Sequence, residues 1–259
     1  MKVEDVMSIN PLCVGVEEYV THAREVMRDN GIQCLPVVRN GKYQGMITVQ
    51  DIISVSSTKS NVTVDGYLRR EVPTVSPSTG LARAARMIIG TDEGRMAVLA
   101  GGGRLAGIIS ITDIFRGIEE LGVPDLPVRD VMTRKVVVTT PDEPISEVWR
   151  NMTAFGFFGF PVVRMDQSVI GMITRVDILR RGYVRFSRES QYIKTPSTVQ
   201  KIMSTPAVTV DESDSVRKAA QIFAGRGISR MPVLKDGRLS GIIDRYDVLK
   251  VCRRLVAIE

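Results

Sequence analysis

The sequence predicts an α/β protein made of four copies of one unit: a short turn, a strand, a helix, two strands and a final helix. The first observation is a pattern of glycine, two apolar residues, usually a hydroxyl residue, and aspartate six places after the glycine, at 45–51, 107–113, 171–177 and 241–247. The second is spacing. An apolar residue of the N-terminal turn stands 29 positions before a site that reads Pro-Val in three copies and Ala-Val in the second. These turn residues are Met7, Leu68, Met132 and Met203.

The first two copies show the unit most clearly. In the first copy we expect a strand over 11–16, a helix over 19–29 that ends at Asn30-Gly31, strands over 35–39 and 43–48, and a final helix from Asp51. The second copy predicts a strand over 74–75, a helix over 81–89 and strands over 96–99 and 105–110.

The triple glycine 101–103 could indicate a phosphate-binding loop. It lacks the following Gly-Lys-Ser/Thr, and it takes the position of the Asn40-Gly41 turn of the first copy. The sequence therefore predicts a hairpin loop.

The third and fourth copies repeat the order. Strands are expected over 136–139, 207–210, 231–235 and 239–244, and helices over 145–155 and 216–224. Three aromatic residues, Phe157, Phe158 and Phe160, precede or begin the Pro-Val strand of the third copy. They could stack on a base or pack into the core.

The copies give the domain boundaries 1–60, 61–122, 126–182 and 198–259, with a proline-containing linker at 122–127 between the halves and a basic linker at 183–197. Between 180 and 194, five basic residues stand against Glu189 alone. This strip is either a solvated linker or a docking strip for an acidic partner or nucleic acid. No helix-turn-helix, zinc-finger or RNA-recognition motif accompanies it, so nucleic acid is the less favoured partner.

Composition restricts the function classes. A net charge of +6 over 259 residues favours anionic partners. No apolar run approaches the ~20 residues that span a bilayer, and the chain begins directly in the first repeat without an apolar signal segment, so we expect a cytoplasmic protein without a membrane partner.

Cysteine and histidine give no sign of catalysis or metal binding. The three cysteines are far apart and form no CxxC pair, and Cys13 and Cys34 are expected to be buried. The lone His22 is expected on a helix surface. Without a Cys-His pair, a metal cluster or a nucleophile elbow, the sequence predicts neither an enzyme nor a metal site.

The repeated Thr/Ser-x-x-Asp spacing allows two interpretations. Across a strand-to-helix corner it is the spacing of a capping box, in which Thr48 caps the helix that Asp51 opens. The same corner places a hydroxyl, backbone N–H groups and a carboxylate together. The hydroxyl and N–H groups suit a phosphate, and the carboxylate suits the two hydroxyls of a ribose.

The four copies resemble CBS domains (cystathionine-β-synthase-type repeats) in the Pro-Val strand and in the Gly-x-x-Thr/Ser-x-x-Asp corner. The resemblance implies that repeats pair into two Bateman modules, in a disc with pseudo-fourfold symmetry similar to the γ regulatory subunit of AMP-activated kinase. It also implies that clefts between paired repeats bind AMP, ADP, ATP or other adenosyl ligands.

The resemblance transfers site residues by position. The ribose-binding carboxylates are Asp51, Asp113, Asp177 and Asp247, and the phosphate-side hydroxyls are Thr48, Ser110 and Thr174. The fourth copy departs with Asp244, whose charge the adjacent Arg245 could offset, and Arg175 is its counterpart in the third copy. Arg95 and Arg230 stand two residues before the Ala-Val and Pro-Val sites, where Cys34 and Gly159 lie in the other copies. The predicted site also includes Ser229.

The predicted function is therefore a non-catalytic adenine-nucleotide sensor, as a monomeric disc or a homodimer, with a regulated partner protein. The alternatives are an interaction scaffold, in which the corners serve only as helix caps, and a binder of nucleic acid or another partner through the 180–194 strip.

Overall fold

The computed structural model describes residues 1–53, 61–91, 94–180 and 197–256. The first repeat contains β1 (Ser8–Ile9), β2 (Val14–Gly15), α1 (Val20–Asn30), β3 (Cys34–Arg39), β4 (Lys42–Thr48) and α2 (Val49–Ile53). The second contains β5 (Thr74–Val75), α3 (Leu81–Ile89), β6 (Arg95–Ala100), β7 (Arg104–Ser110) and α4 (Ile111–Ile114). The triple glycine forms a short 3-10 turn that joins β6 to β7, so the predicted hairpin loop is confirmed.

The third repeat contains α5 (Ile145–Ala154), β8 (Gly159–Val163), β9 (Val169–Thr174) and α6 (Arg175–Arg180). The fourth contains β10 (Val210–Asp211), α7 (Val216–Arg226), β11 (Arg230–Lys235), β12 (Arg238–Asp244), α8 (Arg245–Lys250) and α9 (Arg253–Val256). The strand expected over 136–139 is wrong, because only an isolated bridge forms, from Thr139 to Val162. The basic strip lies almost wholly outside the described residues.

Helix burial follows the spacing of apolar residues. In α3, Leu81, Ala84, Ala85 and Ile88 recur at helical spacing and are at most 2% exposed. In α7, the buried set is Val216, Ala219, Ala220 and Phe223. Both stripes face one core that repeats 2 and 4 share, where the rings of Phe115 and Phe223 meet edge to face at 5.8 Å. Repeats 1 and 3 each have a core of their own.

Each repeat lends an N-terminal segment to its neighbour. We call residues 3–9, 64–69, 128–133 and 199–204 the crossing segments. Segment 3–9 pairs with β7, 64–69 bridges to Met46 in β4, 128–133 bridges to Ile242 in β12, and 199–204 bridges to Met172 in β9. Buried residues of each segment belong to the neighbour's core. The first repeat is thus interlocked with the second, and the third with the fourth.

The crossing segments explain the glycine of the repeated pattern. A Cβ at Gly45 would lie 2.2 Å from the carbonyl oxygen of Arg69, and one at Gly107 would lie 2.7 Å from that of Ser8. A Cβ at Gly171 would lie 2.7 Å from the Ser204 carbonyl oxygen. A side chain at these positions would push the crossing backbone away from the strand, so only glycine allows the interlock.

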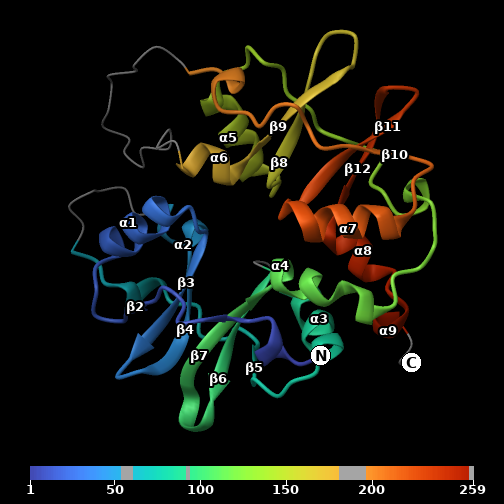
Figure 1. The fold of residues 1–259 in the computed structure, drawn as a ribbon. Coiled ribbons are helices and arrows are strands. Elements are labelled where there is room, and N and C mark those ends of the chain that lie inside the picture. The colour runs from blue at the N-terminus through green and yellow to red at the C-terminus, as the bar shows by residue number, and fades with distance from the viewer. Residues whose placement is uncertain (54–60, 92–93, 181–196, 257–259) are drawn as a thin grey trace.

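Two modules result, repeats 1–2 and repeats 3–4 (Figure 1). In the first module the strands form one sheet, joined between the repeats at Lys42 and Arg104, whereas β8–β9 and β10–β12 of the second module form separate sheets among the described strands. Helices α1 and α6 contact each other between repeats 1 and 3, while α3 contacts α8 and α9. The disc-like arrangement stays a prediction.

Candidate functional site

The strand-to-helix corners all form capping boxes. In the first three repeats the hydroxyl of Thr48, Ser110 or Thr174 donates to Oδ2 of the aspartate three residues on, at 2.6, 2.7 and 2.5 Å. The backbone N–H of the same residue donates to that oxygen at 2.8 Å in each copy. Helix capping by the repeated pattern is therefore present in the structure.

The fourth corner keeps the cap but adds a charge. Asp244 Oδ1 accepts from the backbone N–H groups of Tyr246 and Asp247 at 2.8 and 3.1 Å, and the Asp244 N–H donates to Asp247 Oδ2 at 2.9 Å. Burial, and next the charge of Asp244, raise the pKa of Asp247 to about 6. This corner disfavours the ionised form of Asp247, and with it any further negative charge.

A second hydrogen bond closes each corner. The first backbone N–H of the corner helix donates to a carbonyl three residues before the Pro-Val or Ala-Val site: Val49 to Gln33, Ile111 to Gly94, Arg175 to Phe158 and Arg245 to Ser229, at 2.8–3.1 Å. Ser229 therefore takes part in the fourth corner through its carbonyl, and its side chain is exposed. A ligand-binding role for it stays a prediction.

In each module, the residue two positions before the Pro-Val or Ala-Val site of one repeat lies against its counterpart from the other repeat. Arg95 lies 3.9 Å from the sulfur of Cys34, and a Cβ at Gly159 would lie 3.5 Å from Cδ of Arg230. Each module thus combines one arginine with one small residue. A second arginine at this contact would crowd and repel the first, which explains why the arginine occurs once in each module.

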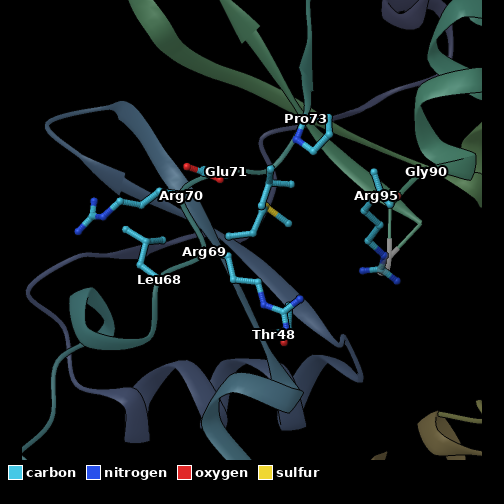
Figure 2. Close-up of a pocket in the computed structure, with 11 residues that line it drawn as sticks. Thr48, Leu68, Arg69, Arg70, Glu71, Pro73, Gly90 and Arg95 are labelled. Atoms are coloured by element: carbon cyan, nitrogen blue, oxygen red, sulfur yellow. The ribbon is translucent and has the colours of Figure 1, made fainter.

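A cavity of about 550 Å³ lies between repeats 1 and 2. Figure 2 shows Arg69 and Arg95 extending along it, with Arg69 reaching toward Thr48 and Arg70 pointing away. The cavity joins the first corner to the central arginine of the module. It is lined by Met46, Thr48, Leu68, Arg69, Arg70, Glu71, Val72, Pro73, Gly90, Thr91 and Arg95.

Arg69 connects this cavity to the first corner. Its Nε donates to Oδ1 of Asp51 at 2.8 Å, and the carboxylate side chain is 15% exposed. Asp51 itself is not among the lining residues of the cavity. The sequence reasoning missed Arg69, although a signal was available. It directly follows the landmark Leu68, where the other copies have Ser8, Thr133 and Ser204.

The second corner is closed. Asp113 is only 4% exposed and pairs with Arg116 at 3.1 Å. Arg245 of the fourth repeat lies beside it, and its guanidinium donates to the Phe223 carbonyl at 3.0 Å and to the Thr112 hydroxyl. Burial lowers the pKa of Arg245 to about 10, and the charge of Asp113 acts in the opposite direction.

Arg175, in the third corner, makes the corresponding contact with the first repeat. It donates to the Met152 carbonyl at 2.6 Å and to the Gln50 side chain, in the first repeat, at 3.2 Å. Both arginines therefore bridge the two modules, at positions where the sequence predicts phosphate ligands. A phosphate-binding role for either one would require an exchange of these contacts, and it stays a prediction. Asp177 lies in its capping box at the same corner.

The aromatic residues of the third repeat have mixed surroundings. Phe157 packs edge-on against Phe160 at 5.7 Å, but only Phe160 is buried, as expected for core packing, and Phe157 is 39% exposed. The guanidinium carbons of Arg175 and Arg230 lie over the ring of Phe158 at 4.6 and 5.5 Å. Burial lowers the pKa of Arg230, and the carboxylates of Asp244 and Asp247 partly offset this.

Several predictions about single residues have outcomes in the structure. The expected burial of Cys13 is wrong: the side chain is exposed, because the strand begins only at Val14. Cys34 is buried, and His22 is exposed on α1 beside Glu18, as predicted.

In the described part of the chain, no group of three or more His, Cys, Asp or Glu residues could hold a metal ion. None of the described helices has the length and apolar character to cross a membrane.

Comparison with known proteins agrees with this repeat structure. The chain is 27% identical to protein MJ1404 of Methanocaldococcus jannaschii over 96% of its own length and 61% of the relative's, so it spans less than two thirds of that protein. It is 25% identical to MJ1225 of the same organism, over 89% of this chain and 91% of MJ1225.

Solved structures show the same fold. The crystal structure of MJ1225, a proposed archaeal homologue of γ-AMPK, matches 96% of this chain and 99% of its own with a TM-score of 0.77 at 24% identity. A conserved protein of Pyrococcus horikoshii matches 97% of this chain and 100% of its own with a TM-score of 0.66 at 23% identity.

The CBS domain model matches residues 3–58, 64–120, 128–183 and 199–254, which include all four corners described above. The chain therefore belongs to the CBS-domain family, and it carries four consecutive copies of the domain.

Proposed function

We propose that this chain is a non-catalytic regulatory protein of the cytoplasm that binds an adenine nucleotide, AMP, ADP or ATP, in the cavity between its first and second repeats. The observation that carries this proposal is the cavity itself, about 550 Å³ in volume, which extends from Thr48 of one repeat to Arg95 of the other. Its volume falls within the range of about 300–1,000 Å³ that small-molecule sites occupy.

The charges along the cavity support a phosphorylated ligand. Arg69 and Arg95 extend along the cavity, whereas Arg70 points away and pairs with Asp65 (Figure 2). Glu71 is the only acidic residue among the described lining residues. Guanidinium groups bind phosphate through paired, charge-assisted hydrogen bonds. The carboxylate of Asp51 lies directly behind Arg69, where it could accept hydrogen bonds from a ribose.

A route to regulation starts at the same corner. Gln50 is next to Asp51 and accepts a hydrogen bond from Arg175 of the other module. A ligand that moves this corner would alter a contact between the modules, to the extent that it binds the two arrangements with different affinity.

Isothermal titration calorimetry with AMP, ADP and ATP tests the proposal. We expect binding by the wild type and a loss of about tenfold or more in affinity for Arg95→Gln, because a charged hydrogen bond to phosphate is removed. Arg104→Gln is the matched control, since Arg104 is exposed in β7 and outside the cavity lining. If the wild type gives no heat with any of the three nucleotides, the proposal is wrong.

The second candidate function is an interaction scaffold without a ligand. It is favoured by the capping boxes, which by themselves account for the hydroxyl and the carboxylate of the first three corners and for the two carboxylates of the fourth. A scaffold has the same melting temperature with and without nucleotide, whereas a ligand that binds the folded state raises it by mass action. Thermal melts at increasing AMP concentrations therefore separate the two functions.

A further inference from the structure

Arg69 extends into the cavity from a fixed backbone. Its N–H donates to the Met46 carbonyl and its carbonyl accepts from the Met46 N–H, both at 2.9 Å. Gly45, beside Met46, allows this close approach. The side chain therefore starts from a rigid position, and the movement available to it is rotation of the side chain itself.

The guanidinium of Arg69 covers the carboxylate that a sugar would use. Its Nε holds Oδ1 of Asp51, while Oδ2 of Asp51 is held by the N–H and hydroxyl of Thr48. Arg69 and Thr48 line the cavity, and Asp51 does not. A ribose that approaches Asp51 from the cavity therefore meets Arg69 first.

Displacement of Arg69 from Asp51 costs little free energy only if the guanidinium binds another anion. The side chain of Arg69 is 36% exposed and that of Asp51 15%, so water partly screens their ion pair. A ligand with a phosphate offers a new partner of the geometry that guanidinium prefers. An uncharged nucleoside offers none, and its ribose must compete with Arg69 for the same carboxylate oxygen.

We propose that Arg69 makes this cavity select phosphorylated nucleosides over the unphosphorylated nucleoside. When the ribose binds Asp51, the guanidinium of Arg69 leaves Asp51 and binds the phosphate. This inference rests on the proposed function. The residue that follows the turn landmark is Ser8, Thr133 or Ser204 in the other repeats, so none of the other three corners has an arginine at this position.

Two substitutions of the same ion pair test this, because they should change the AMP-to-adenosine preference differently. Affinities for AMP and for adenosine are measured by calorimetry on the full chain. Arg69→Gln should weaken AMP binding about tenfold or more and leave adenosine binding unchanged or a few-fold tighter, because a competitor for Asp51 is removed. Asp51→Asn should weaken both ligands through the lost ribose contact, with an AMP-to-adenosine preference at or above the wild-type value. Arg104→Gln, with the same change in net charge, should leave the preference unaltered.

The outcomes are distinct. A lower AMP-to-adenosine preference for Arg69→Gln, together with a preference at or above the wild-type value for Asp51→Asn, supports the proposal, since a merely structural ion pair would give both variants the same effect. A common loss of both ligands in both variants, or a preference unaltered by Arg69→Gln, overturns this inference while the wild type still binds AMP. Absence of AMP and adenosine binding by the wild type overturns the proposed function, and this inference with it.

Discussion

The corners of the first and second repeats have the same local geometry and opposite surroundings. Thr48–Asp51 and Ser110–Asp113 make the same capping hydrogen bonds, with lengths that agree within 0.1 Å. The first corner lies behind Arg69 at the edge of a cavity. The second is covered by Arg116 and by Arg245 of the fourth repeat, and Asp113 is 4% exposed.

The difference shows that the repeated pattern determines the cap, and that distant residues determine what the carboxylate can bind. Arg69 comes from the crossing segment 64–69 of the next repeat, and Arg245 from the opposite module. Neither arginine lies within the corner that it covers. Access to a corner in this chain therefore depends on residues of neighbouring repeats as well as on residues of the corner's own repeat, such as Arg116.

Substitution of the glycines that contact the crossing segments should give the largest difference in unfolding free energy between the two corners. Gly45→Ala should cost about 4 kcal/mol of unfolding free energy and Gly107→Ala about 2 kcal/mol, from overpacking and backbone strain. A Cβ at Gly45 would lie 2.2 Å from a backbone carbonyl oxygen, and its φ is +152°. At Gly107 the nearest atom is 2.7 Å away and the backbone needs no left-handed φ.

Urea denaturation at 25 °C measures both losses. Equal costs would contradict this account, because they would mean that the segment at Arg69 moves as easily as the segment at Ser8. Gly41→Ala separates strain from crowding, since Gly41 has a φ of +74° and no neighbour within 4 Å of the added Cβ.

Substitution of Arg69 or Arg245, the arginines that cover the two corners, should give the second-largest difference in unfolding free energy. Arg245→Met should cost about 3 kcal/mol, because it removes a positive charge near the buried Asp113 and a donor from the Phe223 carbonyl. Arg69→Met should cost less than about 1 kcal/mol, because its ion pair is partly solvated. Denaturant midpoints give the comparison. A cost of Arg69→Met as large as that of Arg245→Met would show that the first corner is as closed as the second.

The sequence predicted the parts of this comparison that depend on local pattern. The boundaries of α3 and β5 agree with prediction to the residue, and the other helices and hairpin strands mostly within one or two. Arg69 was missed because its role depends on a segment that crosses to another repeat, and repeat spacing does not reveal which strand receives that segment. The contacts of Arg175 and Arg245 depend on how the modules pack, which no spacing within one repeat determines.

The fourth corner extends the comparison to charge. Because the pKa of Asp247 is raised to about 6 by burial and by Asp244, its protonated form stabilises the folded chain. This stability is complete below about pH 4 and is lost as the pH rises through about 6. A shift of two pKa units corresponds to about 3 kcal/mol, and solvent screening of the partly exposed carboxyl reduces this to about 1–2 kcal/mol.

Asp244→Ser, which copies the hydroxyl of the second corner, should remove part of that loss, because burial, the larger cause of the raised pKa of Asp247, remains. Lys250 favours the ionised form of Asp247 and is unchanged in this variant. Urea midpoints of wild type and variant at pH 4.5, 5.5, 6.5 and 7.5 check this. The expected result is a variant that gains stability over the wild type as the pH rises. Parallel curves of urea midpoint against pH would show that the charge of Asp244 does not affect the ionisation of Asp247.

The smallest effect should be the same at both corners. Thr48→Val and Ser110→Ala each remove a capping hydroxyl and leave the carboxylate and the strand in place. Each should cost about 1 kcal/mol, as the loss of a helix cap does. If the cap is a local property of the pattern, the two costs agree within about 0.5 kcal/mol although one corner faces a cavity and the other is buried. A much larger loss at Ser110, measured by the same urea titration, would mean that the surroundings strengthen the cap itself, so that capping and access are not separable in this chain.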